Sequence, residues 1–126
     1  MIEIEIPYNP ISAPRPRVAR GRVYYDQRYD VWRAIVSHFG KLAMRGKPPL
    51  KGSLSVSLHF YKKITPTSKS FGDVDNLSKA VLDALNGICY EDDSQIVELY
   101  IEKNRADKPR CEIEIGQLVH CEIEMD

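Results

Sequence analysis

Two groups of carboxylates, separated by about the length of one helix, are the residues best suited to do chemistry. Asp73 and Asp75 stand at alternate positions and are followed by Asn76 and Lys79, and a second acidic group occupies residues 91–93. Hard oxygen ligands without soft ligands among them suit Mg²⁺ or Mn²⁺. Metal ions held in this way activate water and neutralise charge on a leaving oxygen, so the pattern predicts metal-assisted phosphoryl chemistry.

The segment between the two acidic groups has helical spacing, at about 100° per residue. One face is apolar and is made by Leu77, Ala80, Val81, Ala84, Leu85 and Ile88. The opposite face is polar and is made by Asn76, Lys79, Asp83 and Asn86. The pair Asn86-Gly87 is typical of a helix end. We therefore expect a helix that is anchored by its apolar face, with carboxylates at its entrance and just beyond its exit.

A purely structural interpretation accounts for part of this pattern. Asp73 is able to cap the helix, and Asp75 and Lys79 are spaced to form an i, i+4 ion pair worth about 0.3–0.5 kcal/mol. Helix capping does not account for the second acidic group at residues 91–93. An EF-hand loop is excluded because the ligand and glycine positions carry the wrong residues, and zinc is disfavoured because Cys89 is the only Cys or His in the cluster.

Taken together, these residues resemble the RusA family of Holliday junction resolvases. The motif block covers about a fifth of the chain. The residues that carry the resemblance are Asp73-x-Asp75-Asn76-x-x-Lys79, Leu82-Asp83-Ala84-Leu85 and Asp92-Asp93-x-Gln95-Ile96. A basic Pro/Arg segment near the N-terminus, followed by a helix, is also similar in order.

The resemblance implies a small homodimeric endonuclease that cuts four-way DNA junctions with Mg²⁺, for which Mn²⁺ can substitute. Carried over by motif, the metal-binding and catalytic aspartates are Asp73, Asp75 and Asp93, with Asp92 as the alternative to Asp93. The catalytic lysine is Lys79. The resemblance leaves two other classes open, a non-catalytic DNA-binding protein on the same fold and a small metal-dependent phosphohydrolase acting on nucleotides.

The net charge of zero hides a division of the chain into a basic and an acidic part. Residues 1–70 hold 13 Lys and Arg against 4 Asp and Glu, whereas residues 71–126 hold 5 against 14. This asymmetry predicts a basic surface for a polyanion beside an acidic site for metal. The residues expected to contact DNA phosphates are Arg15, Arg17, Arg20, Arg22, Lys62, Lys63 and Lys69. The lysines stand where the best-known family member is rich in arginine.

The remaining pattern predicts the elements that position this site. Alternation predicts strands over residues 1–7, 53–61, 95–103 and 111–115, and a continuation of the last strand or a separate short strand over 119–125. Helical spacing predicts a helix over residues 27–44, with Trp32 in the core or in a dimer contact. Prolines and a glycine predict no regular element over residues 10–22. The expected fold class is α/β, of the α+β kind: two layers in a single RusA-like domain over residues 1–126. One mixed, largely antiparallel sheet is covered by two helices.

Neither a membrane helix nor a signal peptide is expected from the pattern of apolar residues. Three cysteines without metal-type spacing predict reduced thiols and a cytoplasmic protein. These expectations are compatible with what the resemblance implies, a homodimeric endonuclease that acts on four-way junction DNA.

Overall fold

Strand β4 (Leu54–Lys62) lies inside the sheet and fixes the orientation of the layers. Leu54, Val56, Leu58 and Phe60 alternate along it, and each is at most 1% exposed. Strict alternation places all four on one face, which must then be covered by other elements. The predicted inward face of this strand is therefore confirmed.

The computed structural model describes residues 1–13, 17–19, 22–24, 27–63 and 73–118. In this part of the chain the main sheet has the order β1-β6-β4-β5. Strand β6 (Arg110–Gln117) pairs antiparallel with both β1 (Ile2–Ile6) and β4, whereas β5 (Ile96–Arg105) pairs parallel with β4. The sheet is therefore mixed, and β1 and β5 are its edges.

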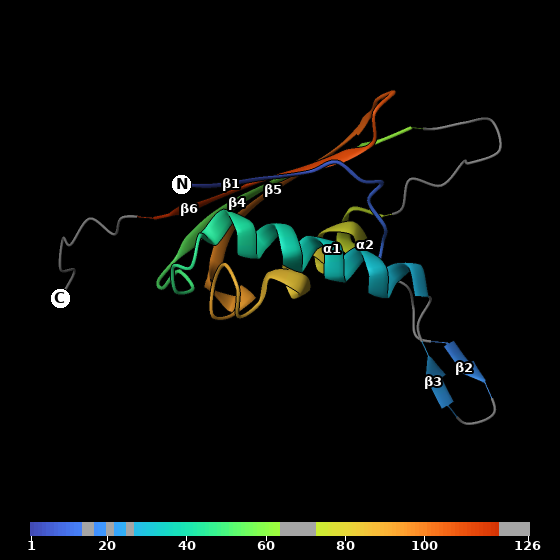
Figure 1. Cartoon of the computed structure of the whole chain (residues 1–126), viewed down its shortest axis with the longest axis horizontal. Helices are drawn as coiled ribbons and strands as arrows, with labels where there is room; N and C mark the ends of the chain where they lie inside the picture. Colours follow the sequence, from blue (N-terminus) through green and yellow to red (C-terminus); the bar gives the residue numbers. More distant parts are fainter. Residues whose placement is uncertain (14–16, 20–21, 25–26, 64–72, 119–126) are drawn as a thin grey trace.

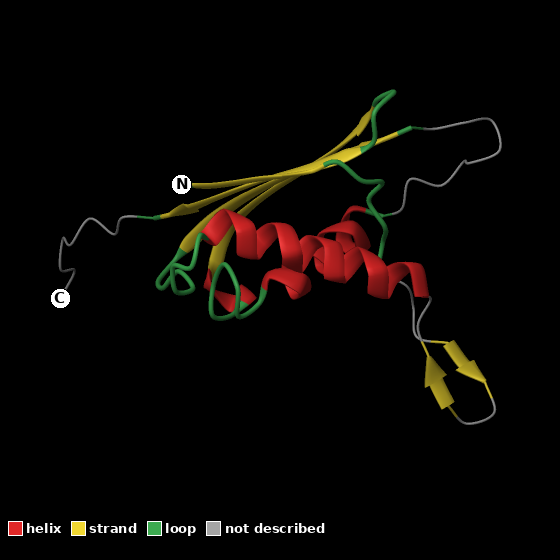
Figure 2. Ribbon diagram, in the orientation of Figure 1, coloured by secondary structure: helices red, strands yellow, loops and turns green. Residues whose placement is uncertain are grey.

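Helices α1 (Gln27–Met44) and α2 (Val74–Leu85) lie on the same face of this sheet, as Figure 2 shows. The predicted bounds of α1 are confirmed, and Trp32 is 2% exposed, so it belongs to the core. The predicted apolar face of α2 is also confirmed, because Leu77, Ala80 and Val81 are fully buried. The result is the two-layer α+β fold that the sequence predicts.

The path from β4 through α2 to β5 sets the direction of α2 (Figure 1). Because β4 and β5 are parallel, the chain leaves one end of the sheet and re-enters at the other, so α2 runs antiparallel to both strands. Two backbone hydrogen bonds agree with this direction of α2. The Ala13 amide, which follows β1, donates to the Asn76 carbonyl at the start of α2, and the Leu50 amide, which precedes β4, donates to the Cys89 carbonyl.

One prediction about the basic N-terminal segment was wrong. Residues 10–22 were expected to hold no regular element, yet β2 (Arg17–Ala19) and β3 (Arg22–Tyr24) pair antiparallel, with Val18 opposite Val23. The prolines precede the first strand, and the glycine falls between the two strands, where it does not interrupt the pairing. Short strands of Arg, Val and Tyr can pair under these conditions.

Smaller differences concern the ends and faces of other elements. Strand β6 extends beyond the predicted residues 111–115 and runs through Gly116 to Gln117. Leu42 on α1 and Val97 and Leu99 on β5 are apolar but are 58%, 61% and 43% exposed. The predicted strand over residues 119–125 lies outside the described residues. Cys89 and Cys111 are buried free thiols, and no helix in the described ranges is long and apolar enough to cross a membrane.

The close approach of α1 and α2 at Gly40 generates a prediction about stability. A Cβ atom at Gly40 would lie 2.6 Å from Leu85 Cδ2 and 3.4 Å from Ile88 Cγ2, so Gly40→Val forces the two helices apart. We expect a loss of about 1–3 kcal/mol, as for other overpacked cores. The control is Lys41→Val, which places the same side chain at an exposed position of the same helix. Thermal unfolding that gave equal midpoints for both variants would contradict this packing.

Candidate active site

The first acidic group lies at the start of α2. Asp73 is the N-cap residue, and its carbonyl accepts the first helical hydrogen bond from the Leu77 amide at 2.9 Å, but its side chain makes no capping hydrogen bond. The Ser78 hydroxyl donates to the Asp75 carbonyl at 3.0 Å. Both carboxylates are on exposed residues. The capping interpretation of Asp73 is therefore not supported, and its carboxylate, like that of Asp75, belongs to an exposed residue at the start of α2.

Lys79 lies one turn further along α2 and is exposed. Among the described residues, Lys79 and Asp75 do not form the ion pair that their i, i+4 spacing allows. The interpretation of Lys79 as the partner of Asp75 in a structural ion pair is therefore not supported. Its ammonium group is instead left on the same polar side of the helix as Asp75, in reach of a ligand that approaches the start of α2.

The second acidic group has a different architecture, because Asp92 has a structural role there. Its carboxylate accepts a hydrogen bond from the Ser94 amide at 3.0 Å, and the Gln95 side chain accepts one from the Asp92 amide at 2.9 Å. This capping box begins η1 (Asp93–Gln95), a single 3₁₀ turn. The Ser94 hydrogen bonds hold the pKa of Asp92 below its usual value. Asp93 is not used as a cap, which makes it the better candidate ligand of the two.

Gln95 and Tyr90 fasten this acidic turn to the rest of the fold. Gln95 Nε2 donates to the carbonyls of Leu50 and Gly52, both at 2.9 Å, just before β4 begins. The Tyr90 hydroxyl donates to the Leu82 carbonyl at 2.6 Å. Burial raises the pKa of Tyr90, and the charge of Asp93 raises it further. The acidic turn is therefore held close to the second half of α2.

The two acidic groups consequently lie toward opposite ends of α2 rather than in one cluster. Asp75 in the first turn of α2 and Asp83 in its last turn are separated by about 12 Å along the helix axis, at about 1.5 Å per residue. A Mg²⁺–oxygen bond is only about 2.1 Å long. Within the described ranges, no three Asp, Glu, His or Cys residues are close enough together to hold a metal ion. Among the described residues, the chain thus does not gather Asp73, Asp75 and Asp93 into one metal site.

The residues at the start of α2 nevertheless fit a hard divalent cation. Mg²⁺ is commonly held by one or two protein carboxylates, with water and substrate phosphate completing its octahedral shell. Asp73 and Asp75 offer two solvent-facing carboxylates without soft ligands. This donor set suits Mg²⁺ or Mn²⁺ and leaves coordination positions for a third carboxylate and a phosphate.

Cationic residues gather at the same end of the sheet. Lys62, the last residue of β4, lies opposite Arg105 in the parallel pairing with β5. Burial lowers the pKa of Lys62, and the nearby charge of Arg28 on α1 lowers it further. Lys63 follows and is exposed. A polyanion bound here would meet positive charge next to the Asp73–Asp75 pair.

The other predicted phosphate contacts are not described in this detail. Arg17 and Arg22 belong to β2 and β3, but nothing is described of their side chains. Arg15, Arg20 and Lys69 lie outside the described residues. Their contribution to DNA binding therefore remains a prediction from the sequence.

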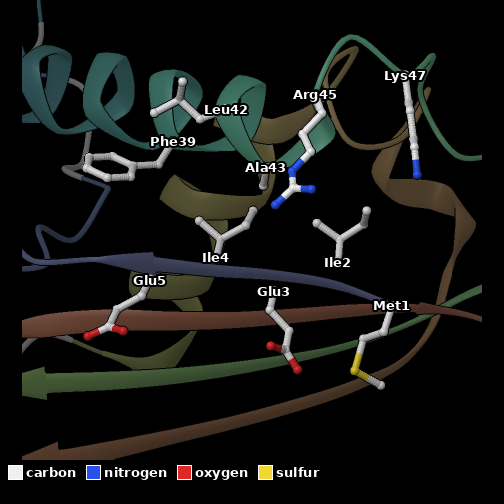
Figure 3. Close-up of a pocket in the computed structure, with 10 residues that line it drawn as sticks. All are labelled: Met1, Ile2, Glu3, Ile4, Glu5, Phe39, Leu42, Ala43, Arg45 and Lys47. Atoms are coloured by element: carbon white, nitrogen blue, oxygen red, sulfur yellow. The ribbon is translucent and has the colours of Figure 1, made fainter.

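A hollow between β1 and α1 does not contain any of these residues (Figure 3). Ile2 and Ile4 point into it from β1, and Phe39 and Ala43 border it on α1, whereas Glu3 points away from the helix. It lies at the β1 edge of the sheet, across from β5. The carboxylate of Glu3 thus points away from the hollow. The candidate site is instead the exposed surface at the start of α2.

The geometry defines a class of protein: a small two-layer α+β domain with paired carboxylates at a helix start, a lysine one turn later and cations beside them. A family model described as endodeoxyribonuclease RusA matches residues 7–116. The chain belongs to the RusA endodeoxyribonuclease family. It is also 46% identical over 55 residues to "Uncharacterized protein YqaN" of Bacillus subtilis (strain 168). That similarity covers 44% of this chain and 37% of the relative.

Sequence reasoning missed two residues that shape the site. Gln95 was quoted only as part of a motif, although Asp92-x-x-Gln95 has the spacing of a capping box and could have been recognised as one. No sequence pattern indicates the role of Tyr90, because its hydroxyl reaches the Leu82 carbonyl on α2 only through the tertiary fold.

The different roles of Asp92 and Asp93 generate a pH-dependent prediction. Since the folded-state pKa of Asp92 is depressed, its charge stabilises the fold above its unfolded pKa of about 3.9, and this contribution is lost as the pH falls through the folded value. Asp92→Asn should therefore melt below the wild type at pH 7, and the gap should close at pH 2–3. Asp93→Asn should melt with the wild type at pH 7. Thermal unfolding in which the Asp93 variant showed the larger loss would reverse the assignment.

Proposed function

We propose that this protein is a Mg²⁺-dependent, structure-selective endonuclease that resolves four-way DNA junctions in recombination and repair. The observation that carries the proposal is the uncommitted pair of carboxylates at the start of α2, where Asp73 occupies the cap position without capping. Membership of the RusA family supplies the class of reaction, which is hydrolysis of DNA phosphodiester bonds. Bound Mg²⁺ would activate water and neutralise charge on the departing oxygen.

Each residue of the site has a distinct role in this proposal. Asp73 and Asp75 hold the metal, and Asp93 supplies a third carboxylate. Lys79, which has no ion pair with Asp75, stabilises the charge that develops on the scissile phosphate. Since that charge is greatest in the transition state, Lys79 should act on rate more than on binding.

The cations near the start of α2 support DNA as the substrate. Burial lowers the pKa of Lys62, and the nearby charge of Arg28 lowers it further; a phosphate bound between the two side chains would relieve the repulsion between them. A four-way junction needs two cuts in strands of like polarity, and two copies of the chain related by a two-fold axis would supply them. The homodimer is part of the proposal for this reason.

Cleavage of labelled DNA tests the proposal directly. We expect paired nicks at symmetry-related positions of a four-way junction in the presence of Mg²⁺ or Mn²⁺, and no cleavage in the presence of EDTA. Asp75→Asn should abolish cleavage while junction binding stays equal or becomes tighter, because a negative charge near phosphates is removed. Glu114→Gln, which removes one negative charge from an exposed position on β6, is the matched control and should cut normally.

Other outcomes point to other functions. Junction binding without cleavage by the wild type under any metal would favour a non-catalytic DNA-binding protein. Hydrolysis of free nucleotides in preference to junction DNA would favour a nucleotide phosphohydrolase. Normal cleavage by Asp75→Asn would show that the metal site lies elsewhere.

A further inference from the structure

A second hollow lies between the segment that follows β1 and the first half of α1. Tyr8 and Ile11 border it on one side, and Val31 and Trp32 border it on the helix. Its volume is about 410 Å³, and its surface is almost entirely apolar. Sites for small molecules and cofactors typically have about 300–1,000 Å³ and mostly apolar walls. We call this hollow the α1 groove.

The α1 groove has an aromatic floor and open walls. Trp32 is 2% exposed and forms the floor, whereas Val31 and Tyr8 are 59% and 50% exposed. The ring of Phe39 meets that of Tyr8 edge-on, with centroids 6.3 Å apart, and so restrains it. Trp32 Nε1 is buried and has no hydrogen-bond acceptor in the described part of the chain. These walls suit a flat ligand with apolar faces and a polar edge.

Polar side chains at the rim narrow the choice of ligand. Asn9, Gln27 and Arg28 border the α1 groove and are exposed. Amide and guanidinium groups are the side-chain groups that most often hydrogen-bond the edges of DNA bases. A phosphate would find no use for the apolar walls, and an apolar side chain would find none for the rim. A nucleobase uses both, because it stacks through its faces and hydrogen-bonds through its edge.

The α1 groove lies next to the surface proposed to hold the DNA backbone. Ile11 is two residues from Ala13, whose amide donates to the Asn76 carbonyl in the first turn of α2 at 2.9 Å. Two residues of extended chain span at most about 7 Å, so Ile11 lies within about 10 Å of the start of α2. Arg28 lies near Lys62, at the end of β4. A distance of about 10 Å corresponds to roughly three stacked nucleotides of one strand.

We infer that the α1 groove binds one extruded nucleobase of the junction DNA, next to the branch point. The inference rests on the proposed function for the identity of the substrate. Extruding a base costs a few kcal/mol in a duplex, and stacking it on protein side chains returns about 1–3 kcal/mol. At the branch point of an open junction a base has lost a stacking neighbour on one side, so its extrusion costs less. The groove therefore favours junctions over uninterrupted duplex.

Photocross-linking tests this placement without any cleavage. A photoreactive base, 5-iodouracil, replaces thymine at one position at a time around the branch point, and the junction is bound in EDTA and irradiated. We expect one position within about three nucleotides of the branch point to cross-link to residues 8–11 or 27–35. The same base in a plain duplex should cross-link there weakly or not at all. Cross-links that map only to other segments overturn the inference.

A matched pair of variants tests whether the hollow itself holds the base. Val31→Phe fills the α1 groove without a change of charge, and the control Leu42→Phe makes a similar change at a residue of α1 that is 58% exposed. Val31→Phe should lower the cross-linking yield and junction affinity at least about fivefold, which corresponds to about 1 kcal/mol of lost stacking. Its duplex affinity and melting temperature should stay those of Leu42→Phe. Equal yields from the two variants contradict the inference.

Failure of this inference is distinguishable from failure of the proposed function. Cross-linking in the α1 groove together with cleavage in Mg²⁺ supports both. Cross-linking there, with no cleavage by the wild type in Mg²⁺ or Mn²⁺, supports the groove and contradicts the nuclease. Cleavage with cross-links only elsewhere supports the nuclease and contradicts the groove. If Val31→Phe changes the oligomeric mass but not the cross-linking, the groove is a contact between chains and the inference is wrong.

Discussion

The parallel pairing of β4 with β5 is the constraint on which the rest of the structure depends. It forces the connecting helix α2 to run back along the sheet, so its two ends lie at opposite ends of the strands. The apolar face of α2 fixes the helix to the core, and its polar face carries Lys79 outward. The acidic groups at its entrance and exit are therefore held apart by a rigid element rather than gathered by a flexible one.

Much of the fold could be predicted because its patterns are local. Alternation along β4 and helical spacing in α1 and α2 each report which side of the element is buried, and burial of Leu58, Val36 and Leu77 agrees. The carboxylates at the start of α2 were also identifiable, since residue type and spacing define them. Whether Asp73 was used as a cap depended on the hydrogen bonds, which only the structure describes.

The remaining features depend on contacts between distant segments. The order of strands places β6 between β1 and β4, so β5 becomes an edge and its apolar residues, such as Leu99, stay exposed. Alternation predicts a strand over these residues but does not show that no described element covers Leu99. The distance between Asp75 and Asp93 likewise follows from the direction of α2.

A divalent metal ion held at the start of α2 is the feature on which the proposed function depends most. Paramagnetic broadening by Mn²⁺ in amide spectra of the labelled wild-type protein measures this most directly. The signals of residues 73–76 should broaden first and most strongly, while those of residues 50–52, at the other end of the sheet, should be least affected. Strongest broadening of any other described segment would contradict the account.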